Sequence, residues 1–268
     1  MSNYHPLLNV EKIDTDIESY LIDIGDIFRA FRDHDSGCTS FGVAVEGGRW
    51  FVKHSDVPIA IQRLGQAIHL NSIVRHKALP RLRHSFETDD GFSVVYDWVD
   101  GECLRPARPP EVHPRDRFRA LPSDEIIAAL DVIYDAHLLI ADHGFIAEDF
   151  YDGCIIYDFE KKEVHLCDFD NYHSGPFVNE VGRLFGSSRF MAPEEFQRGE
   201  PIDQTTNVFT LGRTAFVLLG DASDSKEAWK GTDAMWSVVK KATNEDRTLR
   251  HQSVRDFVED WRSAIVRG

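Results

Sequence analysis

Four prolines between residues 105 and 115 constrain this chain more than any other feature. The stretch reads RPARPPEVHPR. Proline inside a helix removes a backbone hydrogen bond and clashes with the preceding turn, so no helix interior crosses this stretch. Strand patterns dominate before it and helical patterns dominate after it. We therefore expect a small β-rich part over residues 1–99 and a larger α-rich part over residues 100–268.

Two hairpins and one helix are predicted in the first part. The runs FGVAVE (41–46) and RWFVKH (49–54) flank Gly47-Gly48, a pair suited to the positive φ angles of a two-residue turn. Asp89-Asp90-Gly91 similarly joins LRHSFE to FSVVYDWV (92–99). Between the hairpins, apolar residues at nearly helical spacing predict a helix over about 57–75; they are Ile61, Leu64, Ile68 and Ile73.

Helices and one short hairpin are predicted in the second part. Ser123 is suited to a helix N-cap, and the acidic residues that follow it favour the positive end of the helix dipole. The run VFTLGRTAFVLLG is apolar nearly all round, which predicts a buried helix, and SVRDFVEDWRSAIV is amphipathic. The strands CIIYDF and EVHLCDF surround a turn at Glu160-Lys161-Lys162.

Charge and the lack of export patterns exclude several classes of protein. A formal net charge of −15 argues against a nucleic-acid binder, because such affinity comes mainly from Lys and Arg. The N-terminus MSNYHPLLNVEKIDTD has no basic region followed by an apolar one, and no run of about eighteen apolar residues occurs. The cysteines form no CxxC pair, which predicts reduced thiols. We expect a cytoplasmic chain with neither membrane nor nucleic-acid partners, and leave its oligomeric state open.

Acidic residues gather beside apolar runs in residues 144–172, GFIAEDFYDGCIIYDFEKKEVHLCDFDNY. Asp149, Asp152, Asp168 and Asp170 lie at the ends of the predicted strands. A carboxylate that leaves water needs a cation or hydrogen-bond donors, so this cluster indicates metal or phosphate chemistry. Ordinary turns rich in Asp explain the same pattern equally well.

A stretch late in the chain carries a resemblance to a known family. GSSRFMAPEE (186–195) resembles the end of a protein kinase activation segment, with Ala192-Pro193-Glu194 in the positions of the Ala-Pro-Glu motif. In kinases this Glu pairs with an Arg before the last helix, and Arg250 occupies a matching place. A surface proline turn and an unrelated Arg are the alternative explanation. The order of elements also resembles bacterial serine/threonine kinases, from about residue 25 to 265.

This resemblance implies a two-lobed α+β fold and a set of site residues in one kinase-like domain. Asp149 would be the catalytic Asp that orients the acceptor hydroxyl, and Asp168 would hold Mg²⁺ or Mn²⁺ against the phosphates of ATP. Asp170 or Asp152 would supply the oxygen ligand that kinases take from an Asn, because Cys154 stands in that place and a thiol is a poor ligand for Mg²⁺.

The first part would contribute the nucleotide-binding residues. Lys53 stands where kinases keep the lysine that contacts the α- and β-phosphates, although a Lys at a strand end is also common on solvated surfaces. SGCTSFG (36–42) resembles a degraded glycine-rich loop, or an ordinary hairpin tip. The remaining expected contacts are Gly37, Thr39, Ser40 and Gly42 in that loop, with the backbone of Asp97 and Val99 for adenine.

Several positions depart from the kinase pattern. The helix over about 57–75 contains no Glu to pair with Lys53 and offers Gln66 and Ala67 instead. Phe51 stands where kinases use a small residue above adenine, so its ring is able to fill the nucleotide pocket. Three further substitutions are Glu148 for the Arg that engages a phosphorylated activation loop, Tyr151 for a Lys, and Asn207 for the Asp that supports the catalytic loop.

The function that the resemblance implies is ATP-dependent phosphoryl transfer to a Ser or Thr hydroxyl of a protein. Ser187 or Ser188 is then expected to contact Asp149. A pseudokinase that senses nucleotide or binds a partner protein is the first alternative, favoured by Phe51 and Cys154. A small-molecule kinase similar to the aminoglycoside phosphotransferases is the second. The Asp-x-Asp of CDFD favours it, and the Glu194–Arg250 pairing opposes it.

Overall fold

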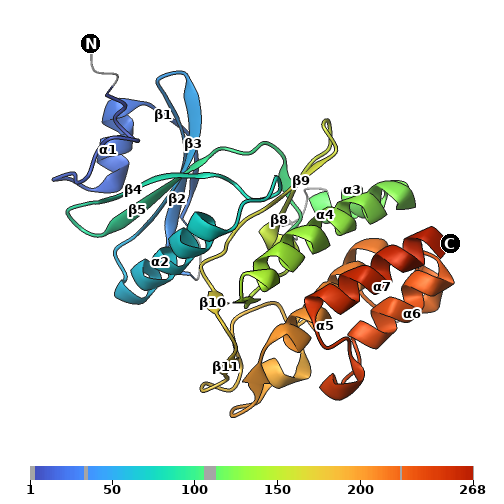
Figure 1. Cartoon of the computed structure of the whole chain (residues 1–268). Helices are drawn as coiled ribbons and strands as arrows, with labels where there is room; N and C mark the ends of the chain where they lie inside the picture. Colours follow the sequence, from blue (N-terminus) through green and yellow to red (C-terminus); the bar gives the residue numbers. More distant parts are fainter. Residues whose placement is uncertain (1–3, 33–35, 106–112, 224, 268) are drawn as a thin grey trace. The chain divides into compact units, whose positions relative to one another are not determined.

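The computed structural model describes residues 4–32, 36–105, 113–223 and 225–267. These residues form a mixed α+β structure with antiparallel sheets (Figure 1). The chain divides into two compact units, Met1–Arg75 with Pro80–Val99 and His76–Leu79 with Asp100–Gly268. The second unit thus takes residues 76–79, which the sequence-based division placed in the first part.

The first unit is built on one antiparallel sheet. Its strands lie in the order β1-β2-β3-β5-β4, with bounds β1 (Asp26–Phe31), β2 (Thr39–Val45), β3 (Gly48–Ser55), β4 (Leu82–Glu87) and β5 (Phe92–Asp97). Two helices accompany the sheet, α1 (Ile17–Ile24) and α2 (Pro58–Ile73). The helix expected over residues 57–75 is therefore present, two residues shorter at its C-terminal end.

Both faces of this sheet are covered. Val52 and Val95 pack in one cluster with Leu7, Val10 and other residues of the N-terminal segment and α1. On the neighbouring positions of β5, Val94 and Tyr96 pack instead in a cluster with Ala60 and Leu64 of α2. Figure 1 shows α2 beside the sheet. Successive side chains of a strand point to opposite faces, which explains why β5 is apolar without alternation.

The β2–β3 turn differs by one residue from the prediction. Val45 pairs with Gly48, so the two turn residues are Glu46 and Gly47, with φ angles of 53° and 77°. Gly48 belongs to β3, where a Cβ atom would lie 2.8 Å from the Trp50 ring. The ring therefore requires glycine at position 48, and Glu46 takes the left-handed turn position instead.

Helices dominate the second unit. They are α3 (Pro114–Arg119), α4 (Ser123–Asp142), α5 (Gln204–Leu219), α6 (Asp233–Ala242) and α7 (Val254–Arg267). Tyr134 of α4 joins three of them: its ring makes edge contacts with Phe257 and Trp261 of α7, and its hydroxyl donates to Leu211 O of α5. All but two residues of α5 are buried, which confirms the buried helix expected from its apolar run.

A proline stands at the start of both α3 and α4. Pro114 is the first residue of α3, where a missing N–H costs nothing, whereas residues 106–112 lie outside the described residues. The structure places Pro122 at the cap of α4 and Ser123 inside its first turn, with no side-chain cap bond. The prediction of Ser123 as the N-cap was therefore wrong. Pro122, whose ring fixes its φ angle, occupies the cap position instead.

Short strand pairs complete the second unit. β8 (Ile155–Asp158) and β9 (Glu163–Leu166) form the expected hairpin, and β6 (Glu102–Cys103) pairs with β8. β7 (Phe145–Ala147) pairs with β10 (Tyr172–Ser174), and β11 (Phe177–Val178) pairs with β12 (Pro201–Ile202). None of the described helices combines the length and apolarity needed to cross a bilayer.

Candidate functional site

Two acidic turns lie together in the second unit. Asp149 is the second residue after the end of β7, and Asp168 is the second residue after the end of β9. The two strand pairings bring these turns together, because the N–H of Glu148 donates to Asn171 O at 3.2 Å and the N–H of Cys167 donates to Cys154 O at 2.9 Å.

Both acids of these turns have an unusual backbone conformation. The φ angles of Asp149 and Asp168 are 62° and 68°, in the left-handed region that residues with a Cβ rarely adopt. Each such residue costs about 1–3 kcal/mol and persists where its surroundings impose it, which occurs most often at active sites and ligand clamps. Lys162 and Ala222 of the same unit also have positive φ angles, so these two turns are candidates because they combine this conformation with acidic side chains.

The Asp149 carboxylate lies between two segments. Asn171 Nδ2 donates to Asp149 Oδ2 at 3.4 Å, and the Cys154 thiol donates to the backbone oxygen of Asp149 at 3.3 Å. On the other side, a Cβ atom placed on Gly186 would lie 3.6 Å from Asp149 Oδ1. Gly186 has a φ of 133°, so only glycine fits well there. The Asp149 carboxylate thus lies next to the stretch that contains Ser187 and Ser188.

Asp152 does not share the environment of the other acids. Its side chain is fully buried, and both of its oxygens accept hydrogen bonds from the Arg189 guanidinium at 2.9 Å. Arg115 of α3 donates to the same carboxylate at 3.1 Å. A metal ion at Asp152 would have to displace two guanidinium groups, which argues against Asp152 as a metal ligand.

Asp168 and Asp170 differ in exposure, since Asp168 is exposed and Asp170 is 6% exposed. Among the described residues, no three Asp, Glu, His or Cys side chains are arranged to hold a metal ion. Mg²⁺ usually keeps several waters and takes one or two carboxylates together with substrate phosphates. The described residues therefore hold no ready-made cage for a resident metal ion.

Asn207 of α5 supports the start of the Asp149 turn. Its Oδ1 accepts from the N–H of Ala147 at 2.9 Å, and its Nδ2 donates to Ala147 O at 2.6 Å. The amide satisfies both backbone groups of one residue. A carboxylate has no donor for the Ala147 carbonyl, so Asn suits this position without loss of support.

Glu194 and Arg250 form the buried ion pair that the sequence predicted. Arg250 Nη1 and Nη2 donate to the two Glu194 oxygens at 2.7 and 3.0 Å, and Thr206 donates to Oε1 at 2.9 Å. Burial alone would raise the pKa of Glu194, but the Arg250 guanidinium outweighs it and the pKa is lowered. This pair fixes the segment before α5 to the turn before α7.

Glu148 makes a contact that the sequence did not suggest. Its carboxylate accepts from the Phe185 N–H at 3.3 Å and lies 2.7 Å from His173 Nε2. The His173 ring stacks on Phe177, with ring centroids 4.0 Å apart. A Glu beside a single His 25 residues away carries no sequence pattern. Only the β7–β10 pairing, which sets Ile146 opposite His173, shows that they meet.

Burial raises the pKa of two further groups around these turns. The pKa of the Tyr151 phenol is raised by burial, with the charges of Asp149 and Asp168 adding to the effect. The pKa of the Cys154 thiol is also raised well above its usual value, again mainly by burial. Both groups therefore stay neutral at physiological pH. Neither replaces the cationic Lys or the metal-binding Asn of the kinase pattern.

The first unit contains the residues predicted to bind nucleotide. Lys53 lies in β3 between Ser40 of β2 and Val94 of β5, with only 9% of its surface exposed. Thr39 and Ser40 begin β2, and Gly37 just before it has a φ of 72°. Ser55 Oγ donates to Gly37 O at 2.7 Å, which fixes this turn to the end of β3.

An aromatic cluster surrounds Phe51 and Gly42. The Phe51 ring lies 6.4 Å from the Tyr96 ring and 6.5 Å from the Trp98 ring. Phe28 makes an edge contact with Trp98, and a Cβ atom at Gly42 would come within 2.6 Å of both rings. Close approach of aromatic side chains therefore explains glycine at position 42, independently of any phosphate.

The two predicted adenine contacts lie at the end of β5. The Asp97 N–H donates to Arg81 O at 3.0 Å, and the Asp97 carboxylate lies 3.3 Å from Arg83 Nε. This N–H is therefore already engaged within the first unit. Val99 is the last residue of the unit and lies just after the strand.

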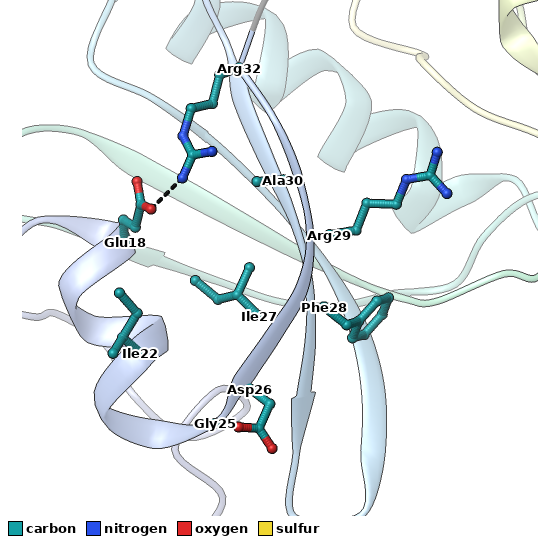
Figure 2. A pocket seen from close by; sticks show the side chains of 9 residues that line it. All are labelled: Glu18, Ile22, Gly25, Asp26, Ile27, Phe28, Arg29, Ala30 and Arg32. Carbon is teal, nitrogen blue, oxygen red and sulfur yellow. Dashed lines mark hydrogen bonds and ion pairs between the residues drawn. The ribbon is translucent and has the colours of Figure 1, made fainter.

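A surface pocket of about 540 Å³ lies between α1 and β1 in the first unit (Figure 2). Ile22 and Phe28 line it together with charged residues, and an Arg32–Glu18 ion pair crosses one side. None of the predicted site residues lines this pocket.

No family model matches the chain. The candidate site therefore rests on the two acidic turns and the residues around them.

Proposed function

We propose that this chain has a protein kinase-like fold and transfers a phosphoryl group from ATP, with Mg²⁺ or Mn²⁺, to a Ser or Thr hydroxyl of a protein. One observation carries the proposal. Asp149 and Asp168 both adopt the left-handed conformation in turns joined by Glu148–Asn171 and Cys167–Cys154 backbone hydrogen bonds. Phosphoryl transfer relies on positioning and charge, and paired carboxylates at fixed places serve both.

Each acid has a distinct role in this proposal. Asp149 accepts a hydrogen bond from the acceptor hydroxyl and orients it, and Asn171 Nδ2 holds the other carboxylate oxygen. Asp168 and Asp170 hold the metal, which neutralises charge on the phosphates when it is bound. Lys53 is assigned to the α- and β-phosphates.

The Glu194–Arg250 pair supports a protein substrate over a small molecule. It buries one end of the segment that begins at Gly186, and Gly186 lies beside Asp149 Oδ1. A segment fixed in this way offers a backbone surface on which an extended peptide can lie, whereas a small substrate gains nothing from it. Ser187 and Ser188 are the first candidates for modification in the chain itself.

A pseudokinase is the second candidate, and the aromatic cluster around Phe51 favours it. The Phe51 ring lies beside the Tyr96 and Trp98 rings, so the aromatic side chains of this part of the sheet already pack against one another around Phe51. A chain of this kind would bind a partner protein, with or without nucleotide, and transfer no phosphate.

Nucleotide binding and phosphoryl transfer separate the two candidates. ATP with Mg²⁺ or Mn²⁺ should raise the unfolding temperature, because ligand at a hundred times its Kd stabilises by about 2.7 kcal/mol. Asp168→Asn should remove the metal-dependent part of this shift. Asn tolerates the left-handed conformation, so this variant changes charge rather than backbone.

The transfer assay uses labelled ATP with the chain alone, with protein substrates and with aminoglycosides. Asp149→Asn should abolish labelling while leaving the thermal shift unchanged. A thermal shift without labelling of any acceptor supports the pseudokinase. Labelled aminoglycoside without labelled protein rejects the proposed substrate class, and no shift with any nucleotide or metal rejects ATP as the ligand.

A further inference from the structure

We propose that Glu148 and Asp152, the carboxylates on either side of Asp149, anchor the two ends of residues 185–189 and hold this stretch beside Asp149 in the unphosphorylated chain. Its use in regulating phosphoryl transfer rests on the proposed function, whereas the anchoring itself does not. The stretch reads Phe-Gly-Ser-Ser-Arg, and each anchor binds one of its terminal residues.

The first anchor is the Glu148 carboxylate, which is 7% exposed. One oxygen accepts from the Phe185 N–H at 3.3 Å, and the other lies 2.7 Å from His173 Nε2. Stacking on Phe177 keeps the His173 ring in place. A buried carboxylate with two donors is a strong attachment point, because hydrogen bonds to charged groups are stronger than neutral ones.

The second anchor is the Asp152 carboxylate, which is fully buried. Arg189 donates to both of its oxygens, the bidentate arrangement that fixes orientation as well as distance. Arg115 approaches the same carboxylate from α3, and Arg213 Nε of α5 donates to Arg189 O at 2.8 Å. The end of the stretch is therefore attached through both its side chain and its backbone.

Gly186 lies between these two attachments, and its carbonyl oxygen also accepts a hydrogen bond from Arg183 Nη2 at 3.0 Å. With Phe185 and Arg189 fixed, Gly186 lies beside Asp149 Oδ1 and the intervening serines remain half-buried or exposed. A phosphate that orders such a segment needs cationic partners. The place beside Asp149 holds Glu148, a carboxylate that repels phosphate. The two anchors thus hold this segment without a phosphate group.

Hydrogen exchange of the full-length, phosphatase-treated chain tests the first anchor. Peptides that cover residues 183–190 should exchange about tenfold faster in Glu148→Ala than in the wild type, because the Phe185 amide loses its acceptor. Glu148→Gln keeps an acceptor oxygen and should restore slow exchange. Glu125→Ala is the matched control: Glu125 accepts from Tyr157 and Lys162 elsewhere in the unit, and its loss should leave this stretch unchanged.

Arg189→Met tests the second anchor without removing the buried Asp152, which keeps Arg115 as its partner. It should speed exchange in residues 186–190 and leave the Phe185 amide slow. The inference is overturned if Glu148→Ala and Arg189→Met both exchange like the wild type. It is also overturned if the phosphatase-treated wild type is unprotected here and becomes protected on phosphorylation of Ser187 or Ser188.

These outcomes are independent of catalysis. Faster exchange in both variants with no ATP-dependent labelling supports the anchors and rejects the kinase proposal. Labelling by a chain whose residues 183–190 exchange alike in all variants rejects the anchors and keeps the kinase proposal. Where Glu148→Ala fails to fold, Arg189→Met and the phosphatase comparison still decide between these results.

Discussion

Burial raises the pKa of the Glu195 carboxyl group to about 8, and the neighbouring charges of Glu194, Glu148 and Asp149 add to the effect. A hydrogen bond from the Ala192 N–H at 2.6 Å acts in the opposite direction and does not outweigh burial. Glu195 is therefore mostly protonated at neutral pH, which lowers the repulsion among these acids.

Glu195→Gln should stabilise the chain increasingly as the pH rises. The folded chain holds the Glu195 proton more tightly than the unfolded chain between the two pKa values, so its stability falls as pH rises through this interval. Gln does not titrate, so the variant lacks this loss of stability. The free energy of unfolding of Glu195→Gln, measured relative to the wild type, should therefore be higher at about pH 8 than at about pH 5 by on the order of 3 kcal/mol. Urea unfolding at both pH values measures the difference.

Glu194→Gln is the matched control, because the pKa of Glu194 is lowered rather than raised. The folded chain then favours the ionised form, and this contribution to stability is present above the unfolded pKa and lost as the pH falls. Glu194→Gln should therefore destabilise the chain at neutral pH. Equal effects of the two substitutions would show that Glu195 is ionised in the folded chain.

Single residues of the site were predictable where a short motif carries them. Asp149, Asp168, Glu194 and Arg250 stand in recognisable stretches, and the structure confirms the Glu194–Arg250 pair. The partners of Glu148 and Asp152 had no such signal, since His173 and Arg189 are ordinary residues in the sequence. They meet these carboxylates only through strand pairing and the path of the segment after β11.

The Glu194–Arg250 pair joins the segment before α5 to the turn before α7. Arg250 also donates to backbone carbonyls of Asn244, Thr205 and Glu245, so one buried guanidinium holds three separate stretches.

Arg250→Met should destabilise the second unit by about 3–5 kcal/mol, because it leaves Glu194 buried without its cation. Arg255→Met is the control, since Arg255 pairs with Asp142 on the surface and such pairs contribute about 0–1 kcal/mol. Chemical denaturation of both variants gives the comparison. Similar losses in the two variants would show that the buried pair is no stronger than an exposed one.

The helix expected over residues 57–75 and the β4–β5 hairpin were predictable to within two residues, because turn chemistry and apolar spacing agree there. The buried α5 begins four residues before its apolar run, and β9 ends three residues before the end of the predicted strand. The N-terminal cover of the first sheet, which includes Leu7, Val10 and Ile13, was not predicted. The β2–β3 turn moved by one residue because Trp50 packs over Gly48, a contact that local turn rules do not contain.

The whole chain is strongly acidic, with 45 Asp and Glu residues against 30 Lys and Arg residues. Excess charge of one sign destabilises a compact state through self-repulsion. Salt shortens the screening length from about 30 Å at 0.01 M to about 8 Å at 0.15 M.

The midpoint of thermal unfolding should therefore rise when NaCl increases from about 0.01 M to about 0.15 M. KCl should act equally, because screening depends on ionic strength and not on the cation. A midpoint that falls with both salts would show that surface ion pairs such as Arg262–Asp131, 2.8 Å apart, outweigh the general repulsion.

The left-handed backbone of Asp168 has a consequence for how this position evolves. An exposed carboxylate at a φ of 68° is a poor choice for a chain selected for stability alone, in which glycine would be favoured. Asp168→Gly should be more stable than Asp168→Ala by about 1 kcal/mol, since both lose the charge and only Ala keeps the strain. Calorimetry of the two variants measures this difference, and equal stabilities would show that the backbone at position 168 carries no strain.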